Sequence, residues 1–244
     1  KDQLGAIFPH DMRALGVRCD TPPLEGGPAT GRCLILVTPD GERTMNTCPG
    51  AAHHLTPQAV DADAVRSATI LYLEGYLFGP ETPRAAMLRA IEIAHEAERT
   101  VAFTLSESVC LPGRKEPLQQ LIAGGGIDLI FANESEALQL AGATDLDGAI
   151  ATLAGQVKTL VFTRGAAGAL AFENGTRTEV PAISVPVVVD TTGAGDLFAA
   201  GFLAARCKGY GIERQLMTGG IAAAEIITHF GARPVADLAE LVKL

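Results

Sequence analysis

Apolar runs alternate with helical patterns along most of this chain. Continuous apolar runs rich in β-branched residues predict strands over residues 69–73, 100–105, 128–131, 159–163 and 185–190. Apolar residues that recur every three or four positions predict helices over residues 82–98, 116–123, 134–141 and 146–154. Strands of this kind, alternating with helices, are typical of an α/β fold in which helices cover both faces of a largely parallel sheet.

Two segments break the alternation, and each predicts a β-hairpin. Residues 33–47 contain two short apolar–polar runs around the turn Pro39-Asp40-Gly41-Glu42. This early hairpin has a polar face, so we expect a small separate sheet that covers a site; an exposed hairpin without function is the alternative. Residues 169–180 turn at Asn174-Gly175 and predict an antiparallel edge of the main sheet.

The C-terminal part of the chain is predicted to be helical. Helices are expected over residues 193–206 and 213–228, with a short helix from Val235. The chain has 244 residues and a 48% hydrophobic content, which is enough to bury the core of one domain.

Composition narrows the classes of partner. The net charge is −9 and no basic run is present, which argues against a nucleic-acid partner. No apolar run approaches the roughly 18 residues of a membrane span, and no signal peptide is visible at the start, so no membrane partner is expected. The cysteines are odd in number and form no C-x-x-C pair, which predicts reduced thiols in a cytoplasmic protein; they are Cys19, Cys33, Cys48, Cys110 and Cys207.

The most informative motif is Asp190-Thr191-Thr192-Gly193-Ala194-Gly195-Asp196. It lies between the predicted strand 185–190 and a predicted helix, so its glycines form a turn at a helix N-terminus. Free N–H groups and the helix dipole favour an anion there. A carboxylate beside an anion site, at Asp196, suits proton removal from a hydroxyl that attacks a phosphoryl group. The motif therefore predicts a kinase.

This motif also has alternative explanations. An ordinary strand-to-helix turn with a capping aspartate explains any single element of it. The helix N-terminus is expected to lower the pKa of Asp196, which makes it a weak base, and Asp190 is expected to order the turn. No G-x-x-x-x-G-K-[ST] sequence occurs, and no G-x-G-x-x-G follows an early strand, which argues against a Walker-type ATPase and a dehydrogenase.

Taken together, the motifs resemble those of the ribokinase-like family of PfkB-type sugar and nucleoside kinases. The seven-residue motif is similar to the family's C-terminal signature. Asn133-Glu134-Ser135-Glu136 resembles its N-x-x-E motif, and residues 163–168 resemble its [ST]-x-G-x-x-G loop. Asp2-Gln3-Leu4-Gly5 looks like its D-x-x-G. The resemblance implies one ribokinase-like three-layer domain over residues 1–244, with residues 33–47 as part of a β lid.

The resemblance also implies roles for individual residues, with ATP and Mg²⁺ as cofactors. Asp196 would be the general base, and the anion hole would consist of Gly193, Ala194 and Gly195. Residues that would bind the nucleotide are Asn133, Thr163, Gly165, Gly168 and Thr192. Glu136 would organise Mg²⁺ through water. A helix-capping Asn133 with a solvated Glu136 is the alternative, and Arg164 could pair with a phosphate or be solvated.

Within the family, residues 73–76, 104–106 and 131–137 look like segments of adenosine kinases. This favours phosphorylation of the primary hydroxyl of adenosine, giving AMP. A ribokinase- or fructokinase-type sugar kinase is the alternative, and a non-catalytic nucleotide-binding protein is the alternative of another class. Relatives often carry a polar side chain near the adenine, but this chain has Gly219-Gly220, so backbone and apolar groups are expected to contact it.

Family members begin with a strand, two lid strands and a G-G motif that hold the substrate. None of these precedes Asp2, so we expect this segment upstream of Lys1. The choice among nucleosides and sugars cannot be read from the residues present. In several relatives the lid forms a dimer contact, which raises the expectation of a homodimer.

Overall fold

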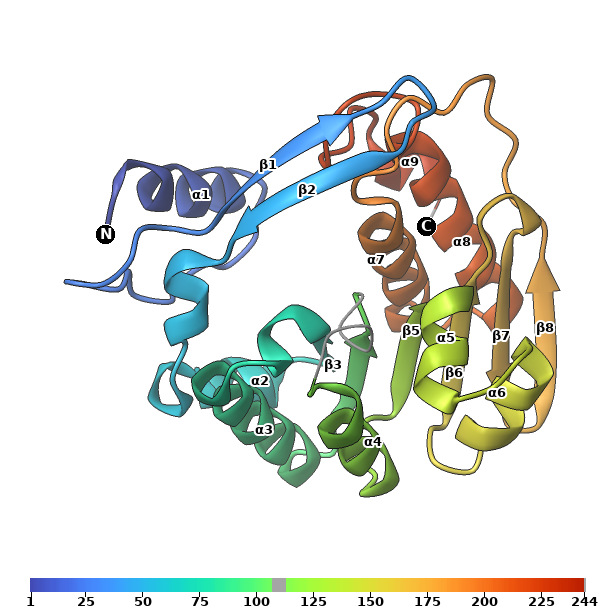
Figure 1. The fold of residues 1–244 in the computed structure, drawn as a ribbon, viewed down its shortest axis with the longest axis horizontal. Helices are drawn as coiled ribbons and strands as arrows, with labels where there is room; N and C mark the ends of the chain where they lie inside the picture. Colours follow the sequence, from blue (N-terminus) through green and yellow to red (C-terminus); the bar gives the residue numbers. More distant parts are fainter. Residues whose placement is uncertain (107–112, 244) are drawn as a thin grey trace.

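The computed structural model describes residues 1–106 and 113–243, and its main element is a mixed β-sheet (Figure 1). In this part of the chain the sheet has six strands in the order β3-β4-β5-β6-β7-β8, of which β3 to β6 are parallel. The strands are β3 (Ile70–Glu74), β4 (Thr100–Thr104), β5 (Leu129–Asn133), β6 (Thr159–Thr163), β7 (Ala169–Glu173) and β8 (Thr176–Val180). The first four confirm the predicted parallel strands within one or two residues.

The strands β7 and β8 form the predicted antiparallel edge. They pair with each other through Glu173 and Thr176, and β7 pairs with β6. Asn174 and Gly175 have φ of +51° and +76°, the positive values that a tight two-residue hairpin turn requires. The Asn-Gly signal therefore set the register of this edge.

Helices cover both faces of the sheet, which makes three layers. Phe103 and Ile130 pack with helices α3 to α6 on one face, whereas their neighbours Ala102 and Leu129 pack with α7 and α8 on the other. This alternation is what continuous apolar strands in a doubly covered sheet require. The helices are α3 (Glu81–Glu96), α4 (Lys115–Ala123), α5 (Glu134–Ala141), α6 (Leu146–Leu153), α7 (Ala194–Cys207) and α8 (Ile212–Ile226).

The early hairpin forms a separate two-stranded sheet, as predicted. Its strands are β1 (Arg32–Val37) and β2 (Arg43–Cys48), and Leu34 lies opposite Asn46 in the register. Figure 1 shows it extending from the region of α1 toward the end of the molecule where α7, α8 and α9 meet. Its turn is therefore brought close to the loop before α7.

One strand prediction is wrong. Residues 185–190 form no strand; the N–H of Val189 donates instead to the carbonyl oxygen of Ile227 at 2.8 Å. Pro186 has no N–H for a sheet ladder, and Val187 remains 60% exposed. The glycine motif thus follows a loop and still opens a helix.

Shorter elements complete the description. These are α1 (Gln3–Ala14), α2 (Ala62–Ser67), α9 (Leu238–Val242) and the 3-10 turns at Gly50–His54, Pro57–Ala59, Gly75–Phe78 and Gly165–Ala167. No helix in the described part of the chain has the length and apolar character needed to cross a bilayer. Four of the cysteines predicted to be reduced are free in the structure, namely Cys19, Cys33, Cys48 and Cys207. The fifth, Cys110, lies outside the described residues.

Candidate active site

The loop before α7 forms a cradle of backbone N–H groups. Gly193 has φ of +81° and precedes the first residue of α7, and a Cβ there would lie 3.1 Å from the Cβ of Ala232. Glycine is required because both the left-handed backbone and the close approach exclude a side chain. Among the described residues, the Ala194 N–H donates to the Thr191 carbonyl oxygen at 3.2 Å, whereas those of Gly193 and Gly195 have no protein acceptor. Two of the three predicted N–H donors thus remain available for an anion.

Asp190 holds this loop in place. The residue is 3% exposed; one carboxylate oxygen accepts the Thr192 N–H at 2.8 Å and the other accepts the Gly231 N–H at 3.0 Å. Burial acts to raise the pKa of Asp190, but these hydrogen bonds outweigh it and hold the pKa below its ordinary value. The predicted ordering role is in agreement with these contacts.

Asp196 lies in the first turn of α7, and its electrostatics differ from the expectation. The surrounding protein desolvates the carboxylate and raises its pKa, although the side chain retains access to solvent and the charge of Arg43 acts in the opposite direction. The expectation that the helix N-terminus lowers this pKa was wrong, because desolvation is the larger effect. A carboxylate with a raised pKa is a better proton acceptor.

Two residues on β3 share this environment and were missed as site residues. Glu74 ends the strand, and desolvation together with the negative charge of Asp196 raises its pKa. Burial and the same charge raise the pKa of the Tyr72 phenol. Their position near the carboxyl end of a parallel strand, where ligands bind in such sheets, is the sequence signal that could have identified them as site residues.

Arg43 joins the early hairpin to the glycine loop and was also missed. Its Nη1 donates to Thr191 Oγ1 at 2.6 Å, and the Thr191 N–H donates to the carbonyl oxygen of Gly41 at 3.3 Å. Since Arg43 also acts electrostatically on Asp196, it brings a positive charge from the hairpin to the cradle. A lone arginine directly after the Pro39–Glu42 turn was the available sequence signal.

A cavity of about 230 Å³ lies beside the cradle. It brings together predicted residues from two distant motifs, namely Thr163, Gly165, Gly168, Ala194 and Gly195. Gly168 has φ of +89°, and a Cβ there would lie 2.1 Å from the carbonyl oxygen of Val180, so no other residue fits. Arg164, directly before Gly165, pairs through Nη1 with a carboxylate oxygen of Glu179 at 2.6 Å.

The other predicted residues do not line this cavity. Thr192 is 5% exposed, and its hydroxyl has no partner among the described residues. Asn133 and Glu136 form a capping box at the start of α5: each side chain accepts the other residue's N–H at 2.8 Å. Asn133 nevertheless pairs in register with Thr163, which places this box next to the cavity.

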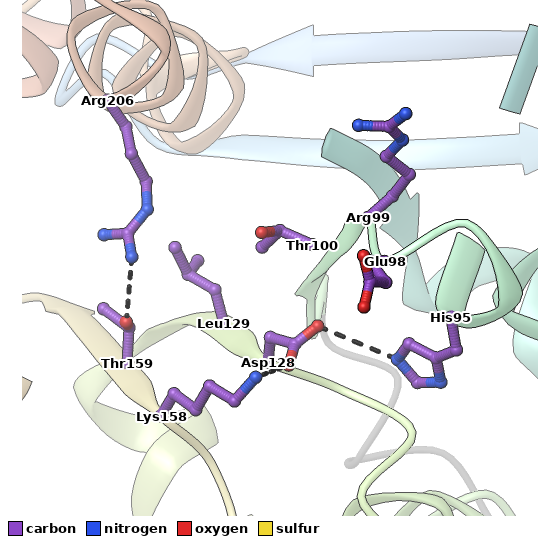
Figure 2. A pocket seen from close by; sticks show the side chains of 9 residues that line it. All are labelled: His95, Glu98, Arg99, Thr100, Asp128, Leu129, Lys158, Thr159 and Arg206. Carbon is purple, nitrogen blue, oxygen red and sulfur yellow. Dashed lines mark hydrogen bonds and ion pairs between the residues drawn. The ribbon is translucent and has the colours of Figure 1, made fainter. Parts of the chain in front are cut away.

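A second hollow, of about 310 Å³, lies at the opposite edge of the sheet, at the amino ends of β4 to β6 (Figure 2). Its charged groups face one another: Asp128 contacts Lys158 at 2.8 Å and His95 at 3.7 Å. Arg206 contacts Glu173 at 2.9 Å. Because these charges neutralise each other, we interpret the hollow as a place where ion pairs stabilise the amino ends of the strands, and not as a ligand site.

The family is established by sequence. A model of the pfkB family carbohydrate kinases matches residues 1–238, and the chain belongs to this family. It is 30% identical over 221 residues to the adenosine kinase of Dictyostelium discoideum, covering 83% of this chain and 63% of that protein. The chain therefore spans less than two thirds of the length of this curated relative.

Solved structures give the same fold. The chain is 42% identical to an adenosine kinase from Sinorhizobium meliloti, with a TM-score of 0.96 over 100% of this chain and 74% of that one. It is equally 42% identical to a probable sugar kinase from Rhizobium etli, with a TM-score of 0.95 over 99% and 73% of the two chains. A putative ribokinase II from E. coli, in complex with ATP and Mg²⁺, is 25% identical with a TM-score of 0.87 over 100% and 79%. These likenesses establish the predicted ribokinase-like fold.

Proposed function

We propose that this chain carries the phosphoryl-transfer machinery of a kinase that phosphorylates the primary hydroxyl of adenosine, with ATP as donor and AMP as product. The observation that carries the proposal is the position of Asp196. Its carboxylate, with a raised pKa, follows an N–H cradle that adjoins a cavity lined by a second glycine loop. The proton acceptor, the anion site and the cavity of about 230 Å³ therefore lie together.

The chemistry follows from this arrangement. Asp196 accepts the proton of the substrate hydroxyl while the hydroxyl oxygen attacks the γ-phosphorus of ATP in line. The bond between the γ-phosphorus and the bridging oxygen breaks, and ADP leaves. The N–H groups of Gly193 and Gly195, and the dipole of α7, stabilise negative charge on the transferred group. Arg43 adds a positive charge from the β1–β2 hairpin, which we propose acts as a lid that excludes water.

Magnesium binding is part of the proposal. Among the described residues, no cluster of three or more His, Cys, Asp or Glu side chains could hold a metal. This fits Mg²⁺ that arrives with the nucleotide, since Mg²⁺ keeps several waters and commonly uses few carboxylates together with phosphate oxygens. We propose that Glu136, one oxygen of which accepts the Asn133 N–H at 2.8 Å, holds the ion through water. Mg²⁺ bound there would supply positive charge that offsets the charge of the phosphates.

A sugar kinase is the second candidate. The observation in its favour is the equal identity to a protein described as a probable sugar kinase. A comparison of kcat/KM for adenosine, other nucleosides, ribose and fructose separates the two candidates. Preference for adenosine supports the proposal, whereas preference for a free sugar keeps the machinery and replaces the substrate.

The acid limb of the pH–rate profile should depend on Arg43. Asp196 must be ionised to accept a proton, so activity is lost as pH falls through its pKa, which lies above the ordinary value. The charge of Arg43 lowers that pKa. Arg43→Gln should therefore move the acid limb of kcat/KM to higher pH, and Arg43→Lys should leave it near the wild-type position. An acid limb that does not respond to Arg43→Gln would contradict this assignment.

We further propose that the lid carries a homodimer contact. Leu34 and Leu36 are 70% and 71% exposed and lie on the same face of β1. Arg43 pairs with Val37 in the register, so its side chain lies on the opposite face of the hairpin. The double variant Leu34→Asp/Leu36→Asp should convert a dimer to a monomer in light scattering after size exclusion. Leu15→Asp, at a leucine that is 70% exposed on another element, is the control. A monomeric wild type would refute the contact.

A further inference from the structure

Glu225 is a buried carboxylate that the proposed chemistry does not use. It lies in the last turn of α8, and its side chain is only 9% exposed. Burial and the negative end of the helix dipole both disfavour a charge at this position. Burial acts to raise the pKa of Glu225, but hydrogen bonds from the N–H groups of Ala236 and Val235 and from His229 outweigh it and hold the pKa below its ordinary value. The carboxylate is therefore ionised at neutral pH.

The residues that hold this charge all belong to residues 229–236, which we call the α8–α9 loop. Oε1 of Glu225 accepts the N–H groups of Val235 at 2.8 Å and Ala236 at 2.9 Å, and Nε2 of His229 lies 3.2 Å from it. Oε2 has no partner in the described part of the chain, so these contacts carry the whole interaction. Hydrogen bonds to an ionised acceptor are roughly twice as strong as those between neutral groups. Glu225 thus ties both ends of the loop to α8.

The same loop touches the glycine cradle at two points. The Gly231 N–H donates to Asp190 at 3.0 Å, and Asp190 in turn accepts the Thr192 N–H at 2.8 Å. A Cβ built on Gly193 would lie 3.1 Å from the Cβ of Ala232, so the two backbones are closely apposed there. A shift of the α8–α9 loop would therefore displace the cradle at both points.

We propose that Glu225 is a positioning residue for phosphoryl transfer, which fixes the α8–α9 loop and through it holds the N–H groups of Gly193 and Gly195 in their active geometry. The inference rests on the proposed function and adds a residue that does not line the cavity. A displacement of about 1 Å can lower a rate by roughly 100-fold, even when it originates away from the chemistry. The effect of losing Glu225 is therefore expected on the transfer step and not on ATP binding.

Steady-state kinetics of two variants test this role. Glu225→Leu removes the acceptor and should lower kcat roughly 10- to 100-fold, with the affinity for Mg²⁺-ATP and the KM for adenosine nearly unchanged. Glu225→Gln keeps an acceptor oxygen but loses the charge, so its kcat should lie between those of the wild type and Glu225→Leu. Each kcat is divided by the number of ATP-binding sites counted by calorimetry, which corrects for unfolded protein. Wild-type kcat per site in Glu225→Leu would overturn the assignment.

Glu173→Leu is the matched control. Glu173 is a partly buried carboxylate that contacts Arg206 at 2.9 Å, but it pairs in register with Thr159 at the opposite edge of the sheet from the cradle. Its loss should lower the thermal unfolding temperature and leave kcat per site unchanged. A loss of kcat as large as that in Glu225→Leu would show a general effect of destabilisation and would overturn the positioning role.

Hydrogen–deuterium exchange tests the coupling without turnover. Glu225→Leu should speed exchange in residues 229–236 and also in residues 190–197, where the N–H groups of Thr192 and Ala194 are hydrogen-bonded. Faster exchange confined to residues 229–236 would overturn the inference. If Glu225→Leu does not fold, wild-type kcat and exchange in Glu225→Gln would overturn it. Faster exchange in both segments of a protein that phosphorylates no acceptor would support the coupling and refute the proposed kinase activity.

Discussion

Asp196→Asn should lower kcat by roughly 10² to 10⁴, the usual effect of losing a general base, with ATP affinity nearly unchanged. The amide cannot accept the hydroxyl proton, yet it has almost the same size and leaves the backbone cradle intact. Removing the negative charge beside the phosphate site also argues against any loss of ATP binding. Steady-state kinetics together with ATP titration would separate the two effects.

The matched control for this variant is Asp145→Asn. Asp145 caps α6 by accepting the Gly148 N–H at 2.8 Å and does not line the cavity, and asparagine caps equally well. We expect wild-type kcat and stability for it. Full turnover in folded Asp196→Asn would refute the assignment of the base.

Gly193→Ala should lower kcat by about 10² to 10³, as expected when a preorganised anion donor is displaced. A Cβ at this position meets Ala232 at 3.1 Å, and φ of +81° is unfavourable for alanine. The loop must shift to relieve both, which moves the N–H group away from the transferred phosphoryl. Kinetics with saturating ATP and acceptor would measure the loss.

The strain at positive φ can be tested on its own. Gly209 has φ of +77°, and a Cβ there meets nothing within 4 Å, so Gly209→Ala carries the backbone cost alone. That cost is about 1 to 3 kcal/mol of stability with no effect on kcat. The anion-hole role would be contradicted if folded Gly193→Ala kept the wild-type kcat and lost only as much stability as Gly209→Ala.

Local signals were sufficient for much of the fold. The helix over residues 134–141 was predicted with its observed bounds, because Asn133 caps its start and Gly142, at φ of +68°, ends it. The Asn174-Gly175 turn similarly fixed the edge hairpin. Residues 185–190 contain β-branched residues that predict a strand, but they form none, because Pro186 cannot donate to a sheet ladder.

Each glycine segment of the candidate site could be located from its own motif, and the roles of its residues stay predictions. The two glycine segments do meet at one cavity, as their places at strand and helix ends suggested. The raised pKa of Asp196 could not be predicted, because it comes from desolvation by the folded chain. Arg43 and Glu74 reach the same environment from the hairpin and from β3, far apart in sequence, and no local pattern records that proximity.

Acceptor-dependent release of ADP from Mg²⁺-ATP by the purified protein, measured with adenosine present or absent, decides whether Asp196 supports phosphoryl transfer to a nucleoside. We expect ADP and AMP in equal amounts with adenosine, little ADP without it, and loss of both products in Asp196→Asn. Binding of ATP without transfer to adenosine, other nucleosides, ribose or fructose would contradict it and favour a non-catalytic nucleotide-binding protein on the same fold.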